Sequence, residues 1–214
     1  MFISLEGIEG SGKSTQIAHL HEHLVQNGYD CLTTREPGGT AIGKGIRALL
    51  LDPSVAGMLP LTELFLYMAD RAQHLNEVVK PALAAGKIVV CDRYFDATMV
   101  YQGQARGLGG ALVADLHRLA FGDLRPDMTF LLDLPPEAGL ARAWDQIADG
   151  GRVSTETRFE MEKLSFHAEV RAGYLTLARL EPERFHVVDA TRTETQVRQE
   201  MVAALNRRLG RMNS

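Results

Sequence analysis

The sequence predicts an α/β fold in which a five-stranded parallel sheet carries helices on both faces. Five short apolar runs, partly β-branched, alternate along the 214 residues with longer segments that have helical spacing of apolar residues. A glycine-rich loop follows the first run, and a charged residue stands at or just beyond the end of every run. The predicted strands are residues 2–5, 30–34, 88–91, 129–134 and 185–188.

The composition is that of an ordinary globular protein, and we expect one domain over residues 1–214. Hydrophobic residues make up 45% and charged residues 23%, and the net charge of −4 argues against a general nucleic-acid or membrane surface. Cys31 and Cys91 lie in apolar runs, where buried free thiols are expected. With no signal-peptide pattern and no membrane-length apolar span, a cytoplasmic location is expected.

The first loop reads G-I-E-G-S-G-K-S between a strand and a helix that carries Ile17, Leu20 and Leu24. Strand, loop and helix together are typical of a phosphate-binding loop, in which backbone N–H groups surround a polyphosphate. Lys13 can reach the β- and γ-phosphates, and the Ser14 hydroxyl can ligate Mg²⁺. The sequence therefore predicts a nucleoside triphosphate site. Its expected residues are Gly7, Gly10, Ser11, Gly12, Lys13, Ser14 and Thr15.

The charges at the strand ends should share one edge of the sheet, where open α/β folds bind ligands. Some of them are expected only to cap turns. The second strand is followed by T-R-E-P-G-G-T, in which Arg35 could clamp a phosphate or lie solvated beside a turn. The third is followed by Asp92-Arg93-Tyr94, which suits Mg²⁺ and phosphate in one site.

A helix starting near Leu61 is expected to place two polar groups beside its core face. That core face is predicted to consist of Leu61, Leu64, Phe65, Met68, Ala72 and Leu75. Tyr67 and Arg71, one turn apart, could stack on a base and hydrogen-bond its edge. Taken alone, this pair of residues is explained at least as well by a half-buried tyrosine and a surface arginine that bind no ligand.

A polar, glycine-containing stretch, Asp145–Thr157, separates predicted helices at Glu137–Trp144 and Phe159–Leu180. A segment of this length and composition inside a compact domain is either a disordered loop or a lid over a site.

Together these motifs resemble the bacterial type of thymidylate (dTMP) kinase, in the nucleoside monophosphate kinase family. The matching stretches are G-I-E-G-S-G-K-S-T, T-R-E-P-G-G-T, D-R-Y-x-x-A-T-x-x-Y-Q-G and the D-L-P at Asp133, and they cover nearly the whole chain. The resemblance implies a phosphate-loop kinase fold with a lid at about 145–157. It also implies ATP- and Mg²⁺-dependent phosphorylation of dTMP to dTDP, and a homodimer.

The resemblance further implies individual roles in the dTMP site. Glu9 would contact the deoxyribose 3′-hydroxyl, and Arg35 and Arg93 would hold the monophosphate. Tyr67 stands where the family usually has a phenylalanine stacked on thymine, and Arg71 where an arginine bonds the base. Thr98, Tyr101 and Gln102 would line the same site, Asp92 would join Ser14 at Mg²⁺, and Glu36-Pro37 matches a position that is often cis.

Phosphoryl transfer needs positive charge around the migrating group. One branch of the family has an arginine within the phosphate loop, where this chain has Gly10, so the charge should come from the lid. We expect Arg152 to supply it, with Arg142 and Arg158 as alternatives, since the lid departs from the family's arginine-rich pattern. The expected catalytic set is therefore Lys13, Arg93, Arg152 and Glu9.

Two other functions remain open at this point. The chain could be a kinase for another nucleoside monophosphate, or a non-catalytic ATP binder. A GTPase switch is disfavoured because no Asn-Lys-x-Asp motif occurs in the sequence.

Overall fold

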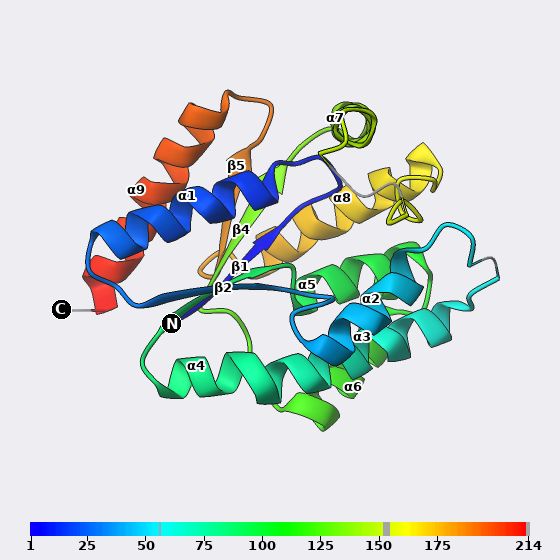
Figure 1. Ribbon diagram of the computed structural model, residues 1–214, viewed down its shortest axis with the longest axis horizontal. Helices are drawn as coiled ribbons and strands as arrows, with labels where there is room; N and C mark the ends of the chain where they lie inside the picture. The colour runs from blue at the N-terminus through cyan, green and yellow to red at the C-terminus, as the bar shows by residue number, and fades with distance from the viewer. Residues whose placement is uncertain (56, 152–154, 213–214) are drawn as a thin grey trace.

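A parallel five-stranded sheet forms the centre of the molecule, as predicted (Figure 1). The computed structural model describes residues 1–55, 57–151 and 155–212. The strand order is β2-β3-β1-β4-β5, and every neighbouring pair is parallel. The observed strands, each within one residue of its prediction at either end, are β1 (Phe2–Glu6), β2 (Cys31–Arg35), β3 (Ile88–Asp92), β4 (Met128–Asp133) and β5 (Phe185–Asp189).

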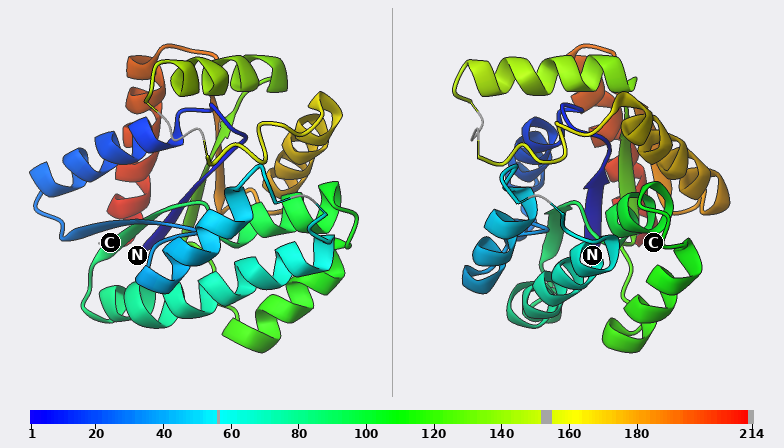
Figure 2. Two further views of the ribbon diagram at one scale, coloured as in Figure 1. Left: turned by 45° about the vertical axis from the view of Figure 1, so that its right-hand side comes forward. Right: turned by 90° about the vertical axis from the view of Figure 1, so that its right-hand side faces the viewer.

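Helices cover both faces of this sheet. Figure 1 shows α1 (Lys13–Gln26) and α9 (Glu194–Met212) side by side on one face. The helices of the opposite side are α2 (Ala41–Leu51), α3 (Pro60–His74), α4 (Lys80–Ala84), α5 (Phe95–Thr98), α6 (Gly110–Phe121) and α8 (Leu164–Leu180). Two π-helical segments, η1 (Leu75–Val79) and η2 (Met99–Ala105), continue α3 and α5. Helix α7 (Pro136–Ala148) crosses the carboxyl end of the sheet (Figure 2).

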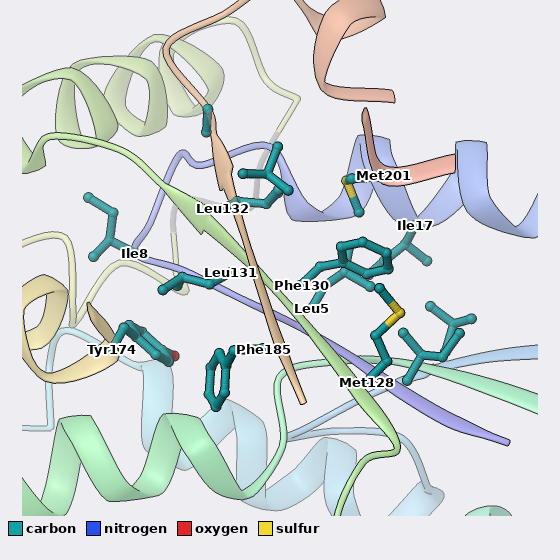
Figure 3. Packing of buried hydrophobic residues seen from close by; sticks show 14 of the residues in the cluster. Leu5, Ile8, Ile17, Met128, Phe130, Leu131, Leu132, Tyr174, Phe185 and Met201 are labelled. Atoms are coloured by element: carbon teal, nitrogen blue, oxygen red, sulfur yellow. The ribbon is translucent and has the colours of Figure 1, made fainter. Parts of the chain in front are cut away.

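The core lies on both sides of the sheet because successive side chains of a strand point to opposite faces. Figure 3 shows Phe130 of β4 on the side of Ile17 from α1 and Met201 from α9. The next residue, Leu131, points instead toward Tyr174 of α8. Burial on both faces explains why the central strands are continuous apolar runs rather than alternating ones.

The predicted core face of α3 is wrong at two positions. Leu61 is 43% exposed and Phe65 is 52% exposed, whereas Leu64 is fully buried as expected. The helix instead buries polar groups, Glu63 and Arg71 among them, since its inner side borders a polar cavity rather than the sheet alone.

The boundaries of the segment between α7 and α8 also differ from the prediction. Helix α7 continues to Ala148, so residues 145–148 of the expected lid are helical, and Trp144 on that helix is 44% exposed. Helix α8 begins at Leu164 rather than Phe159. Phe159 is 5% exposed and packs edge-on against the Tyr101 ring at 5.4 Å, which anchors the non-helical residues before α8.

Among the described residues, no helix combines the length and the apolar character needed to cross a membrane. Cys31 and Cys91 are both free thiols, but only Cys91 is buried as expected, whereas Cys31 is partly exposed. Burial raises the pKa of Cys91 well above its usual value.

Candidate active site

A cavity of about 630 Å³ opens at the carboxyl ends of β1, β2 and β3. Most of the residues predicted for the site meet here, because the parallel strands deliver the segments that follow them to one edge. The predicted residues that line it are Glu9, Gly12, Lys13, Ser14, Thr15, Arg35, Tyr67, Arg71, Asp92, Arg93, Thr98, Tyr101 and Gln102. Gly7, Gly10 and Ser11 belong to the same loop but are not in the lining, and Arg152 lies outside the described residues.

The phosphate loop forms one wall of the cavity. Gly12 precedes α1 with φ 91° and no side chain caps the helix, so the first N–H groups of α1 remain available to an anion. Lys13 Nζ donates to the carbonyls of Gly7 and Ile8, both at 2.9 Å. Burial and the nearby Arg93 charge lower the pKa of Lys13 to about 8. A polyphosphate in the loop would offer this ammonium stronger acceptors than two carbonyls.

Ser14 and Asp92 place two oxygen groups side by side, where they could hold a metal ion. Ser14 Oγ donates to Asp92 Oδ2 at 3.5 Å, which joins the start of α1 to the end of β3. No group of three or more His, Cys, Asp and Glu side chains is arranged for a metal in the described part of the chain. Ser14 and Asp92 could therefore contribute two oxygen ligands to a divalent cation whose other ligands come from phosphates and water.

Arg93 is held in an unusual backbone conformation at the centre of the cavity. Its φ of 66° is the only positive value at a non-glycine residue in the described ranges. The guanidinium donates to Tyr174 Oη at 3.2 Å and to Glu9 Oε1 at 2.9 Å. It also lies over the Tyr101 ring, 4.9 Å from the centroid. Such strain is typical of functional sites, and here it directs a cation into the cavity.

Glu9 is the carboxylate that accepts hydrogen bonds from both Arg93 and Tyr101. Its Oε1 accepts the Tyr101 hydroxyl at 2.7 Å, and the buried His167 ring lies 3.1 Å from its Oε2. Burial alone would raise the pKa of Glu9, but the Arg93 charge and His167 outweigh it and hold that pKa well below its usual range. Glu9 is therefore ionised and can accept a hydrogen bond from a hydroxyl group of a bound ligand.

Arg71 lies at the other end of the cavity and is 1% exposed, so the interpretation as a surface arginine is wrong. Its Nε donates to Glu36 Oε2 at 2.8 Å and its Nη2 to Thr98 Oγ1 at 2.9 Å. Nη1 is buried and has no hydrogen-bond partner within the described residues. Glu36, which orients Arg71, precedes a cis peptide bond to Pro37, as the resemblance implied.

Tyr67 and Gln102 lie beside Arg71. Tyr67 is half-buried, and burial together with the Glu63 charge raises the pKa of its hydroxyl, which stays neutral. Gln102 is 1% exposed and belongs to the π-helical segment η2. Segments of this kind often occur at functional sites, where they redirect a side chain from a helix. An aromatic ring, a guanidinium and an amide thus border one end of the cavity.

The conformation and surroundings of Gly10 explain why no arginine can occupy this position of the phosphate loop. It has φ 70°, and a Cβ there would collide with the backbone carbonyl of Gly139 on α7. Helix α7 therefore packs directly on the loop, and any further cation must come from another segment. Gly139 was not predicted, since no local pattern marks this contact.

The two alternative lid arginines already have partners. Arg142 Nη1 donates to the carbonyl of Ala190, in the loop after β5, at 3.0 Å. Arg158 Nη2 pairs with Glu63 Oε2 at 2.7 Å, and its backbone N–H donates to the carbonyl of Leu51.

Sequence reasoning also missed an ion pair across the cavity rim. Arg47 of α2 pairs with Glu156 Oε2 at 2.7 Å and donates to the Pro37 carbonyl at 3.1 Å. The residues of this pair are 109 positions apart, so no spacing in the sequence could reveal it. It joins α2 to the segment between α7 and α8.

The lining of the cavity therefore combines the phosphate loop, the Arg93 guanidinium and a group of planar polar side chains that includes Arg71 and Gln102. This arrangement can bring two phosphate-bearing ligands together with little covalent chemistry from the protein.

Comparisons with known proteins agree with this geometry. The protein-family model described as thymidylate kinase matches residues 5–201. The chain is 59% identical over 207 residues to a thymidylate kinase of Desulfosudis oleivorans, covering 97% of each chain. It is 60% identical over 210 residues to one of Desulforapulum autotrophicum, covering 98% of this chain and 92% of that one. The crystal structure of a thymidylate kinase from Ehrlichia chaffeensis matches with TM-score 0.76 and 33% identity, over 96% of this chain and 98% of that one.

Proposed function

Because the chain belongs to the thymidylate kinase family and phosphorylates dTMP in an ATP-dependent reaction, we propose that the two walls of its cavity bind the two nucleotides. ATP would lie with its phosphates on the loop around Lys13, and dTMP would lie between Tyr67, Arg71 and Glu9. The observation that carries this assignment is the single cavity that joins the phosphate loop to the buried Arg71.

The thymine would be recognised by its hydrogen-bonding edge and by its ring face. Thymine O4 is an acceptor, which matches the unpartnered Nη1 of Arg71. Thymine N3–H is a donor, which matches the carbonyl oxygen of Gln102. The Tyr67 ring would stack on the base, and Thr98 would hold Arg71 in place at 2.9 Å.

The sugar and phosphate of dTMP would meet the charged centre of the site. Glu9 would accept the 3′-hydroxyl, with Tyr101 and Arg93 fixing its orientation. Tyr101 would lie near the sugar edge that a ribonucleotide would fill with a 2′-hydroxyl. Arg35, exposed at the rim, and Arg93 would hold the monophosphate.

The transfer itself would be an in-line displacement. A dTMP phosphate oxygen forms a bond to the γ-phosphorus of ATP as the bond to the β–γ bridging oxygen breaks, and ADP leaves with that oxygen. No strong general base is needed, because the attacking oxygen is already anionic. Mg²⁺, held by Ser14 and by Asp92 through water, would neutralise charge on the β- and γ-phosphates.

Lys13 and Arg93 supply two of the cations around the migrating group, and we assign the third to Arg152. Three observations support this assignment: Gly10 cannot carry a side chain, Arg142 is hydrogen-bonded to Ala190, and Arg158 is paired with Glu63. Closure of the lid expected at about residues 145–157 would exclude water from the cavity and so limit hydrolysis of ATP.

We also propose a homodimer, formed through the apolar surface that α2 and α3 leave exposed. Leu61 and Phe65 of α3 are 43% and 52% exposed, and Ile42 and Leu49 of α2 are 59% and 44% exposed. The two helices pack against each other, so these side chains can form one patch. Sedimentation of the wild type and of Phe65→Glu tests this: the wild type should be a dimer and the variant a monomer. A monomeric wild type would exclude it.

We place the protein in the reducing cytoplasm, because its two cysteines are free thiols and its substrates are ATP and dTMP.

The assignment of the two walls is tested by a coupled assay of ADP production with dTMP, dUMP, dCMP and thymidine as acceptors. We expect strong preference for dTMP over dCMP and no turnover of thymidine, which lacks the attacking phosphate. Equal use of dTMP and dCMP would contradict the roles given to Arg71 and Gln102.

A further inference from the structure

Glu63 of α3 is a buried carboxylate to which no role has yet been given. It is 1% exposed and contacts three side chains from outside its own helix. Gln102 Nε2 donates to its Oε1 at 2.8 Å. Arg106 donates to both oxygens, at 3.2 Å each, and Arg158 Nη2 lies 2.7 Å from Oε2. Glu63 thus links the base end of the cavity to the residues that precede α8.

These contacts determine which end of the Gln102 amide faces Glu63. Both oxygens of Glu63 accept hydrogen bonds from the Arg106 guanidinium, and Oε1 also accepts one from Gln102 Nε2. Gln102 must therefore turn its NH₂ group toward Glu63, which leaves its carbonyl oxygen on the other side. No hydrogen bond to that oxygen is found among residues 1–55, 57–151 and 155–212, and Gln102 lines the cavity.

We propose that Glu63 is a positioning residue that fixes the Gln102 amide with its carbonyl toward the base, and so makes the enzyme select bases that carry an N3–H donor. This inference rests on the proposed function, in which Gln102 contacts the base. Thymine has a donor at N3, whereas cytosine has an acceptor there. With the amide reversed, Gln102 would present a donor to N3 and favour cytosine.

Discrimination of this kind is strong because a mismatched base leaves buried polar groups unpaired. Gln102 is nearly fully buried, so water cannot compensate for a lost partner. Without Glu63, rotation of the Gln102 amide would let the same side chain serve either base.

The variant that tests the proposal is Glu63→Gln, assayed for kcat and KM with dTMP and with dCMP. A glutamine at position 63 can donate or accept, so it no longer dictates the amide orientation. We expect the ratio of kcat/KM for dTMP to that for dCMP to fall by about tenfold or more, mainly through KM. If Glu63 only anchored Arg106 and Arg158, both substrates would lose kcat/KM in parallel and the ratio would stay constant, which would overturn the proposal.

Glu162→Gln is the matched control. Glu162 Oε1 pairs with the same Arg106 at 2.6 Å, and no contact between Glu162 and Gln102 is found in the described part of the chain. This variant should leave the dTMP/dCMP ratio unchanged. If Glu63→Gln does not fold, Glu63→Asp keeps the charge for the arginines but withdraws the oxygens from Gln102. The ratio should then fall in the same direction, and an unchanged ratio would overturn the proposal.

Gln102→Met separates this proposal from the proposed function on which it rests. If removal of the amide leaves the ratio unchanged, Gln102 does not read the base, and both assignments fail. If Gln102→Met lowers the ratio and Glu63→Gln does not, only the role of Glu63 fails. In the Gln102→Met background, Glu63→Gln should have no further effect on the ratio.

Discussion

Gly10 of the phosphate loop and Gly139 of α7 meet backbone to backbone, with no room for a side chain on either. A Cβ on Gly139 would lie 2.6 Å from the carbonyl oxygen of Glu9 and 2.7 Å from Ile8 Cδ1. The position of α7 is thereby tied to the position of the loop that binds phosphate.

Gly139→Ala should therefore displace α7 from the loop. We expect about 1–3 kcal/mol lower stability from overpacking and a reduced kcat, measured by denaturant unfolding and by ADP production. Gly210→Ala is the control: Gly210 lies exposed in α9, where an added Cβ meets nothing within 4 Å. Removal of a glycine from a helix should make that variant about 0.5–1 kcal/mol more stable. Equal effects of the two substitutions would contradict the close contact.

Arg71→Lys should weaken dTMP binding without affecting ATP. The lysine keeps the positive charge but loses the planar fork that bonds Glu36, Thr98 and the base at once. The KM for dTMP should rise about tenfold or more, with the KM for ATP unchanged. Arg118→Lys, at an exposed pair with Asp115, should change neither constant, and parallel changes in both would argue for general disruption.

Asp92→Asn should raise the Mg²⁺ concentration that gives half-maximal activity. The amide keeps the shape of the side chain next to Ser14, 3.5 Å away, but removes the charge that attracts the ion. A Mg²⁺ titration at saturating ATP and dTMP measures the shift, which should reach about tenfold. An unchanged titration curve would remove Asp92 from the metal site. Chelation of Mg²⁺ should abolish turnover of the wild type.

Glu6, at the end of β1, should make the protein less stable as the pH rises. Burial and the neighbouring Asp96 raise its pKa from 4.5 to about 8. Between these values the folded state holds a proton that the unfolded state has released, so the free energy of unfolding falls with increasing pH. Glu6→Gln should lack this contribution, and its stability relative to the wild type should increase from about pH 5 to about pH 8. Glu183→Gln, at an exposed site, should show no such trend.

Arg152→Ala should lower kcat by about 10²-fold or more if Arg152 supplies the third cation. Because Arg142 is hydrogen-bonded to the Ala190 carbonyl, Arg142→Ala should have a much smaller effect on kcat. Single-turnover measurements of the phosphoryl-transfer step in both variants show which of the two arginines supplies this charge. A larger loss in Arg142→Ala than in Arg152→Ala would reverse the assignment.

The sequence was sufficient for the sheet and for the parts of the site that lie in continuous motifs. Burial on both faces of a parallel sheet makes the three central strands, β1, β3 and β4, nearly continuous apolar runs, so these strands could be predicted directly. The loop at Lys13 and the turn after Asp92 were found because each places its functional groups within a few residues of one strand end.

Other parts depended on contacts that no local pattern encodes. The exposure of Leu61 and Phe65 could not be predicted, because helical spacing says which residues share a side of α3 but not which side faces the interior. Glu63 and Gln102 are 39 positions apart, and Arg47 and Glu156 are 109 apart. His167 reaches Glu9 only because α8 packs against η2.

Trp144 is an intrinsic fluorescent probe of the protein. It is the sole tryptophan of the chain, and it is 44% exposed on α7. The same helix touches the phosphate loop through Gly139 and the cavity through Gln146. Selective excitation of the indole therefore gives fluorescence from α7 alone. A movement of α7 when nucleotides bind can then be observed as a change in this fluorescence in unlabelled protein.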